Sequence, residues 1–215
     1  MRLGIFGGTF DPPHLGHLAL ASAALEQLKL DKVLWVVSGQ SPLKLDRTLS
    51  PAGVRVEMVQ AAIADNPAFV LSRIDLDRPG PHYTVDTLEI LGREFPGAEL
   101  FFLMGEDSLR DLPKWQRPRE IIRRAWLAVA GRPGNHPPEG SEPSGGWSGL
   151  EQSLPGVTAR IVWMKSPRLA IASSDIQSNI RQGQPLIAPI GGQSVREMLP
   201  PAVLAIIKRE QLYQN

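Results

Sequence analysis

Short runs of apolar residues alternate along this chain with longer segments in which apolar residues recur at helical spacing. The short runs predict strands at Leu3–Phe6, Lys32–Val37, Phe69–Ile74, Leu100–Met104, Trp126–Ala130 and Ile161–Met164. The periodic segments predict helices at Leu15–Leu28, Val54–Ala64, Tyr83–Glu94 and Arg119–Arg124. Because strands and helices take turns, the pattern is typical of an α/β fold, with a doubly wound, mostly parallel sheet covered by helices on both faces. We expect a single domain over residues 1–215.

One stretch breaks this alternation. Residues 131–156 are rich in Pro, Gly and Ser and poor in apolar side chains. Such a composition buries too little surface to offset the cost of ordering the chain, about 1–2 kcal/mol per residue. We interpret the stretch as a mobile surface loop between two strands, with Trp147 and Leu150 available to pin its far end.

Composition narrows the possible partners. Of the 215 residues 42% are hydrophobic, and 23 Lys and Arg nearly balance 22 Asp and Glu. A net charge of +1 argues against nucleic acid or an anionic membrane as a general partner, because both attract a basic surface. With 0 Cys, disulfides, thiolate metal sites and cysteine nucleophiles are excluded. No secretory signal or membrane-length apolar run is visible, so we expect a cytoplasmic protein.

The most informative stretch joins the first predicted strand to the first predicted helix. It reads Gly7-Gly8-Thr9-Phe10-Asp11-Pro12-Pro13-His14-Leu15-Gly16-His17, and residues 7–13 are called the glycine turn below. Open parallel sheets bind ligands at the carboxyl ends of their strands. Gly7 and Gly8 let the backbone approach a ligand closely, and the N–H groups of the following helix start suit an anion. Asp11 is the expected cap of that helix.

Two histidines follow the glycine turn. His14 and His17 stand three residues apart, so both project from one face of the helix, with Gly16 leaving room between them. Their imidazoles could donate hydrogen bonds to phosphate oxygens, and one could be charged when a triphosphate is bound. This suits nucleotidyl transfer, in which charge builds on the bridging oxygen as pyrophosphate leaves. The simpler alternative is a glycine turn with two surface histidines; zinc is disfavoured because no third ligand set stands nearby.

His14-Leu15-Gly16-His17 matches the His-x-x-His signature of the nucleotidylyltransferase superfamily. The fuller string from Gly7 to His17 resembles that of the bacterial nicotinate-nucleotide adenylyltransferases, and four further patches extend the resemblance over nearly the whole chain. The resemblance implies a Rossmann-like fold with His14 and His17 as catalytic residues. It assigns ATP binding in this stretch to Gly7, Gly8, Thr9, Phe10 and Gly16.

The first two of these patches concern a lysine and a helix start. Ser41-Pro42-Leu43-Lys44 resembles the family's Pro-His-Lys, with Lys44 matching and Leu43 departing. The resemblance makes Lys44 a catalytic cation on a loop, unless it is an ordinary surface lysine. Pro81-His82-Tyr83-Thr84-x-x-Thr87-Leu88 resembles Ser-Tyr-Thr-x-x-Thr-Leu, which implies that Tyr83 and Thr84 bind the pyridine side of a mononucleotide. Backbone N–H groups at a helix start suit a carboxylate there, although Tyr83 could instead be a core residue.

The third patch comes directly after a predicted strand. Gly105-Glu106-Asp107 followed by Leu112-Pro113-Lys114-Trp115 resembles the family's Gly-x-Asp and Leu-x-x-Trp. The resemblance implies that Gly105 and Asp107 belong to the ATP site, with Asp107 near the ribose or orienting a cation. It also implies that Trp115 stacks on the pyridine ring, unless Trp115 simply seals an edge of the core.

The last patch departs from the family at one charge. Ile171-Ala172-Ser173-Ser174-Asp175-Ile176-Gln177 resembles Ile-Ser-Ser-Thr-x-Ile-Arg, which implies that Ser173 and Ser174 cap the next helix and bind triphosphate oxygens. The Arg that contacts the triphosphate in the family falls on Gln177, and a neutral amide cannot neutralise a polyphosphate. Arg181, one helical turn further on, is our candidate for the missing catalytic cation, and Arg168 is the alternative.

Together these resemblances imply a Mg²⁺-dependent transfer of AMP from ATP to nicotinate mononucleotide, giving deamido-NAD and pyrophosphate. No acidic cluster in the sequence marks a metal site, so we expect Mg²⁺ to arrive on ATP. Two alternatives stay open: another acceptor, such as nicotinamide mononucleotide, and a nucleotide-binding regulator without turnover. The acid-versus-amide choice and the oligomeric state are also left open by the sequence.

Overall fold

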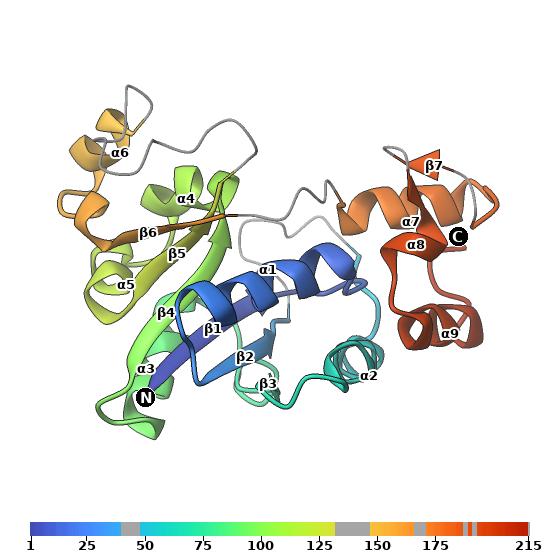
Figure 1. The fold of residues 1–215 in the computed structure, drawn as a ribbon, viewed down its shortest axis with the longest axis horizontal. Coiled ribbons are helices and arrows are strands. Elements are labelled where there is room, and N and C mark those ends of the chain that lie inside the picture. Colours follow the sequence, from blue (N-terminus) through green and yellow to red (C-terminus); the bar gives the residue numbers. More distant parts are fainter. Residues whose placement is uncertain (40–47, 132–146, 166–170, 187–188, 191–192, 215) are drawn as a thin grey trace.

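The fold is seen in a computed structural model that describes residues 1–39, 48–131, 147–165, 171–186, 189–190 and 193–214 (Figure 1). Its centre is a six-stranded sheet with the order β3-β2-β1-β4-β5-β6, and every neighbouring pair is parallel. The strands are β1 (Arg2–Gly8), β2 (Lys32–Val37), β3 (Phe69–Ser72), β4 (Glu99–Gly105), β5 (Trp126–Ala130) and β6 (Ile161–Met164). The chain first builds outward from β1 to β3 and then returns to add β4 on the other side of β1, which confirms the doubly wound α/β prediction.

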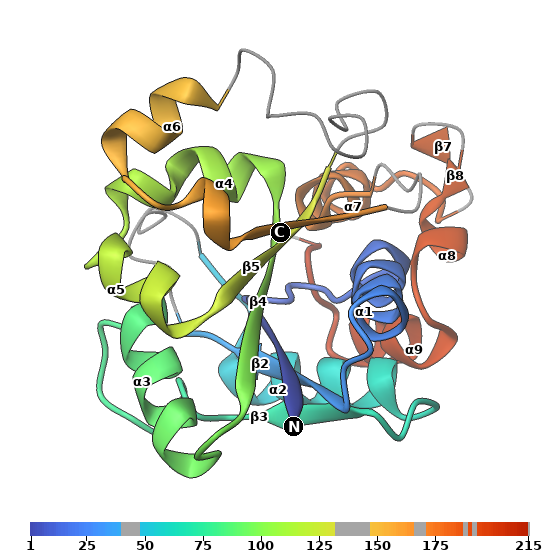
Figure 2. The ribbon, with the colours of Figure 1, turned by 60° about the vertical axis from the view of Figure 1, so that its left-hand side comes forward.

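Helices cover both faces of this sheet. On one face lie α1 (Leu15–Gln27) and α2 (Ala52–Ile63). The other face carries α3 (Thr84–Glu94), α4 (Glu106–Asp111), α5 (Pro118–Arg124) and α6 (Ser148–Ser153), as Figure 2 shows. Successive residues of a strand point to opposite faces, and in β2 Leu34 and Val36 pack on the α3 side while Trp35 packs on the α1 side. Burial on both faces explains why the strands read as continuous apolar runs.

All six predicted strands and all four predicted helices are present, with ends that differ by no more than two residues. The periodicity therefore located the layers correctly. The prediction that Ile161–Met164 is the last strand holds for the sheet but not for the chain. Two short antiparallel strands, β7 (Pro189–Ile190) and β8 (Gln193–Ser194), follow it.

The prediction of a loop at 131–156 is wrong for Ser148–Ser153, which form the helix α6. Trp147 and Leu150 are buried, as proposed, but they belong to a helical segment rather than to the end of a loop. Leu154 and Val157 continue the same buried stripe, and Trp147 packs against Trp163 with ring centroids 5.3 Å apart. Four apolar side chains at helical spacing cover the sheet here, which outweighs the helix-breaking composition upstream. Residues 132–146 of the predicted loop lie outside the described residues.

The C-terminal helices form a smaller lobe beside α1 and α2. It contains α7 (Ser173–Arg181), α8 (Val195–Met198) and α9 (Pro201–Arg209), seen together in Figures 1 and 2. Its own apolar cluster includes Ile176 and Val203 and reaches α2 through Met58. The lobe places the start of α7 next to the glycine turn, as the contacts below show. In the part of the chain that the structure describes, no helix has both the length and the apolar character needed to span a bilayer.

Candidate active site

A cavity of about 950 Å³ opens where the carboxyl ends of β1, β2 and β4 meet. This is the point at which the strand order reverses, the usual ligand position in an open α/β sheet. Five segments that are distant in sequence line it together. The predicted site residues among its lining are Gly7, Gly8, Thr9, Phe10, His17, Tyr83, Thr84, Trp115, Ser173, Ser174 and Arg181.

The glycine turn is anchored from inside by Phe10. This residue has a left-handed backbone, with φ of 48°, and its ring is buried edge-on against Phe6 at 5.3 Å. A Cβ added to Gly8 would lie 3.1 Å from the Phe10 ring, so any larger residue there would push the ring away from its present position. Phe10 thus acts mainly as a core anchor that shapes the turn, although part of it also lines the cavity.

His14 and His17 form a stacked pair at the start of α1, with ring centroids 3.7 Å apart. His14 is the N-cap residue, and its Nδ1 accepts a hydrogen bond from the backbone N–H of His17 at 3.3 Å. In return, Nδ1 of His17 accepts from the backbone N–H of His14 at 3.2 Å. This reciprocal capping box is built from two imidazoles, and it assigns the ring protons to Nε2. His17 lines the cavity while His14 is buried behind it.

Both imidazoles are neutral in the folded chain. Burial lowers the pKa of His14 from 6.5 to about 4. Burial also lowers the pKa of His17 well below 6.5, and the neighbouring His14 adds repulsion against a second charge. A proton on Nδ1 would in addition break a helix-capping hydrogen bond. The pair therefore presents Nε2–H donors without a positive charge at neutral pH. That one ring could be charged when a triphosphate is bound stays a prediction.

Folding stability should fall as the pH is lowered from 6.5 towards 4. The unfolded chain takes up a proton on His14 near pH 6.5, whereas the folded chain does so only near pH 4. The stability of the folded state is therefore complete above pH 6.5 and loses roughly 3 kcal/mol from His14 alone as the pH approaches 4. Urea unfolding at pH 7.5, 6.5, 5.75 and 5 measures this slope.

The matched control is His14→Asn, which keeps a good N-cap acceptor but does not titrate. Its unfolding free energy should change less with pH over the same window than that of the wild type. Equal slopes for the two proteins would contradict the neutral, buried state of His14.

Asp11 does not cap α1, contrary to the sequence prediction. Two prolines separate it from the helix, which begins only at Leu15 with His14 as its cap. The buried Asp11 carboxylate instead accepts hydrogen bonds from the backbone N–H of Ser50 at 2.9 Å and from the hydroxyl of Tyr213 at 2.5 Å. It is thus committed to tertiary contacts.

The opposite side of the cavity begins at the N-terminus of α3. Tyr83 is the N-cap residue, so the helix starts at Thr84, one residue later than predicted. Both residues line the cavity together with Trp115, and these three are called the acceptor wall. Trp115 packs edge-on against Phe102 of β4, with ring centroids 5.9 Å apart, so it contacts the core and the cavity at once.

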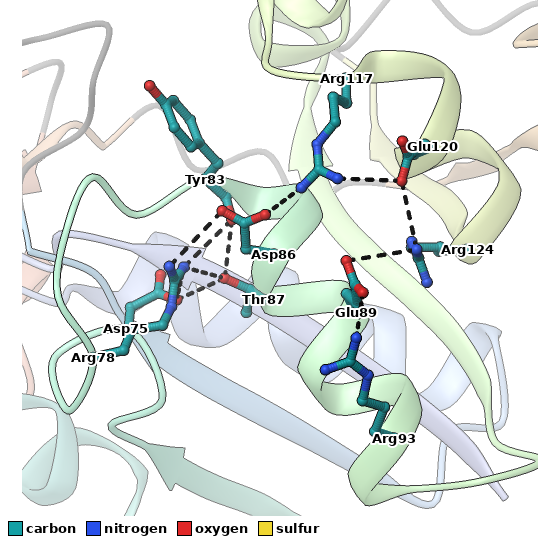
Figure 3. A network of polar contacts seen from close by, with 10 residues as sticks. All are labelled: Asp75, Arg78, Tyr83, Asp86, Thr87, Glu89, Arg93, Arg117, Glu120 and Arg124. Atoms are coloured by element: carbon teal, nitrogen blue, oxygen red, sulfur yellow. Dashed lines mark hydrogen bonds and ion pairs between the residues drawn. The ribbon is translucent and has the colours of Figure 1, made fainter.

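A polar network holds the two parts of the acceptor wall together (Figure 3). Behind Tyr83, the guanidinium of Arg78 donates to Asp75 at 3.0 Å and to the Tyr83 carbonyl at 3.4 Å. In the first turn of α3, Asp86 forms an ion pair with Arg117, which directly precedes α5. Arg117 lies two residues beyond Trp115, so this ion pair fixes the Trp115 segment against the start of α3.

The start of α7 closes the cavity beside the glycine turn. The Ser173 hydroxyl donates to the carbonyl of Pro12 at 2.9 Å, and the Gln177 amide donates to the carbonyl of Asp11 at 2.6 Å. The N-cap of α7 is Ala172 with no side-chain capping bond, so the prediction that Ser173 and Ser174 cap this helix is wrong. Ser173 is used to attach α7 to the turn instead. Arg181, at the last turn of α7, lines the cavity as its sequence position suggested.

Four predicted site residues that the structure describes are not found in the cavity lining. His14 lies behind His17, and Gly16 supports the pair, because a Cβ there would lie 3.0 Å from Nδ1 of His14. Gly105 and Asp107 stand at the N-terminus of α4, where Asp107 is exposed and lies 3.7 Å from Arg110. Their neighbour Ser108 does line the cavity. Lys44 lies outside the described residues.

Sequence reasoning passed over several residues of the lining. Ser38 follows β2 at the same edge of the sheet as the glycine turn, so the strand-end rule could have identified it. Asp75 and Asp111 carry no comparable signal. Among the described residues, no group of three or more His, Cys, Asp or Glu side chains could hold a metal ion.

Comparison with known proteins places this chain among relatives that match it from end to end. The model of the family described as cytidylyltransferase-like matches residues 5–179. A Thermus thermophilus protein named "Probable nicotinate-nucleotide adenylyltransferase" is 41% identical over 214 residues, covering 100% of both chains. A Thermomicrobium roseum protein of the same name is also 41% identical over 214 residues, covering 100% of this chain and 92% of that one.

Solved structures share the fold. Plasmodium falciparum nicotinic acid mononucleotide adenylyltransferase complexed with NaAD aligns with a TM-score of 0.74 at 16% identity, over 99% of this chain and 97% of that one. The complex of the same protein with APC aligns with a TM-score of 0.73 at 16% identity, over 99% and 96% of the two chains. At this identity the likeness establishes the architecture alone, and it agrees with the doubly wound sheet described above.

Proposed function

The chain belongs to the cytidylyltransferase-like family and, within it, to the nicotinate-nucleotide adenylyltransferases, and from this premise we propose its reaction. The protein transfers the adenylyl group of ATP to nicotinate mononucleotide, giving deamido-NAD and pyrophosphate. The observation that carries the proposal is that one cavity is shared by the glycine turn with His17 and by the acceptor wall. The first side suits a polyphosphate and the second suits a flat aromatic ring.

The reaction needs positioning more than proton transfer. A phosphate oxygen of the mononucleotide attacks the α-phosphorus of ATP in line, and the bond from that phosphorus to the bridging oxygen breaks as pyrophosphate leaves. The attacking phosphate is already a nucleophile at neutral pH, so no general base is required. The protein lowers the barrier by aligning the two substrates and by donating hydrogen bonds where negative charge grows.

On the ATP side, we assign these donors to the glycine turn and to α7. The Nε2–H groups of the histidine pair donate to phosphate oxygens, with His17 nearest the cavity and His14 holding its ring in place. Gly7, Gly8 and Thr9 let the nucleotide approach the end of β1. The hydroxyl of Ser174 and the guanidinium of Arg181 serve the leaving pyrophosphate. Lys44, Gly105 and Asp107 stay predictions of the family resemblance.

On the acceptor side, we assign the pyridine ring to a position against Trp115. The backbone N–H groups at the start of α3 then suit the nicotinate carboxylate, because a helix N-terminus favours an anion. We propose that the metal is Mg²⁺ and that it arrives as MgATP, bound to the phosphates and keeping most of its water. Among the described residues no group of three ligands could hold the ion, which agrees with a metal that enters as part of the MgATP substrate.

The test is pyrophosphate release by the purified chain with MgATP and a panel of acceptors. Nicotinate mononucleotide should support turnover, and the amide should be used at least about tenfold less well, because it lacks the charge that the helix start favours. Preference for nicotinamide mononucleotide or another phosphate would reassign the acceptor. ATP binding without pyrophosphate release from any acceptor would instead identify a nucleotide-binding regulator and overturn the proposed reaction.

A further inference from the structure

Asp11 is held from three directions, each by a different part of the chain. Its carboxylate accepts from the Ser50 backbone N–H just before α2, and from the Tyr213 hydroxyl near the C-terminus. Its backbone carbonyl accepts from the Gln177 amide of α7 at 2.6 Å. Asp11 is buried yet also lines the cavity, directly after the glycines and Phe10. The position of the glycine turn therefore depends on contacts with the C-terminal lobe.

A buried arginine completes the cluster around Asp11. Arg55 of α2 donates to the carbonyl of Thr9 at 2.8 Å, to that of Ser38 at 2.7 Å and to that of Ser50 at 3.0 Å. It thereby fixes the chain after β1, the chain after β2 and the residue that bonds Asp11. The negative charge of Asp11 offsets the burial that lowers the pKa of Arg55. Removing one donor from a buried carboxylate costs more free energy than the loss of an ordinary hydrogen bond, because part of the charge is left buried without a partner.

Tyr213 supplies that donor from the far end of the sequence. It follows α9 and is packed partly against the apolar cluster of the C-terminal lobe. Burial and the neighbouring Asp11 charge raise the pKa of its hydroxyl, so the hydroxyl remains protonated and a donor at neutral pH. The bond joins residues that are 202 positions apart, which is a constraint that no local interaction of the turn could supply.

We propose that Tyr213 is a positioning residue for the ATP side of the cavity, acting on the glycine turn through Asp11. Gln177 takes part in the same arrangement by tying α7 to the Asp11 carbonyl, which gives this amide a structural use at the position where the family resemblance expects a charged contact. The inference rests on the proposed function, because it names which substrate the cluster serves. The acceptor wall is held separately, by the network around Asp75 and Asp86 (Figure 3).

The experiment compares Tyr213→Phe, which removes only the hydroxyl, with the wild type. KM for ATP and the Kd of a non-hydrolysable ATP analogue measured by calorimetry should both rise about 5- to 10-fold. KM for the mononucleotide should stay within about twofold, since the acceptor wall is not touched. Backbone hydrogen exchange across residues 7–17 should quicken in the variant, and this readout needs neither substrate.

Two further variants separate positioning from general stability. Leu212→Ala loses an apolar contact in the same lobe but no bond to Asp11, so it should lower the unfolding temperature and leave KM for ATP unchanged. In Asp11→Asn, adding Tyr213→Phe should raise KM for ATP little further, because the two residues act as one unit. Additive effects, or a Tyr213→Phe protein with wild-type KM for ATP, would overturn the inference. Failure of the proposed function is a different result, namely a wild type that releases no pyrophosphate.

Discussion

His17→Ala is expected to lower kcat/KM for adenylyl transfer by about 100- to 1,000-fold, the usual cost of removing one pre-aligned donor to a developing negative charge. The ring lines the cavity at the end of the glycine turn, and its Nδ1 is already occupied as a helix-cap acceptor. Its Nε2–H is thus the group left to meet a phosphate oxygen. Because the ring is neutral, the loss should appear mainly in kcat, where charge develops, and less in the binding of MgATP.

Two conservative replacements test which nitrogen matters. An Asn side chain at position 17 can imitate Nδ1 and keep the reciprocal cap, but it has no group where Nε2 stands. A Gln side chain can place its amide near Nε2 and restore part of the donor. We therefore expect His17→Asn to be nearly as slow as His17→Ala while unfolding close to the wild-type temperature, and His17→Gln to recover about tenfold. Near-normal turnover of His17→Asn would show that the imidazole serves α1 rather than the reaction.

The sheet was predictable because its strands are buried on both faces. The strands read as apolar runs, and α3 shows clear helical periodicity with its buried Val85, Leu88 and Leu91. The α6 segment was not predictable from local composition, since the Pro, Gly and Ser residues before it dominate any window. Its formation depends on tertiary burial of Trp147 and Leu150 against the sheet, and this burial outweighs the composition of the residues before it.

The candidate site could be predicted where its residues are consecutive in sequence. It could not be predicted where a residue depends on partners that are distant in sequence. The glycine turn and the histidine pair follow from a strand, a turn and a helix that are consecutive in sequence. Asp11 resembled a helix cap because Asp is a preferred N-cap residue and Pro is favoured at the first helical position. Its true partners, Ser50 and Tyr213, are 39 and 202 residues away, and no local rule connects them. The same holds for Gln177, whose amide bonds a carbonyl 166 residues earlier.

The charge missing at Gln177 leads to the second large expected effect. Arg181→Ala should lower kcat/KM for adenylyl transfer by about 100-fold, equivalent to about 2.7 kcal/mol of lost transition-state stabilisation. The amide of Gln177 donates to the Asp11 carbonyl, so it is not available to bind the phosphates as pyrophosphate leaves. Arg181 stands one turn further along α7, at the same cavity, with a longer and permanently charged side chain. The measurement is steady-state pyrophosphate release at several ionic strengths, because salt should weaken the wild type more than the variant.

The experiment tests the positive charge of Arg181 rather than its shape. The control is therefore Arg181→Lys, which keeps the charge but lacks the planar guanidinium. It should retain activity within about tenfold of the wild type. Arg196→Ala removes an exposed arginine of the neighbouring α8 that is not part of the cavity lining, and it should leave turnover unchanged. If Arg181→Ala also turned over normally, the compensating cation would have to come from Lys44 or Arg168, and the same assay on those two alanine variants would identify it. A cation carried on a helix can reach the triphosphate only from a turn that faces the cavity. In α7 the side chain at position 177 already bonds the Asp11 carbonyl, so the cation has to come from another position of this helix.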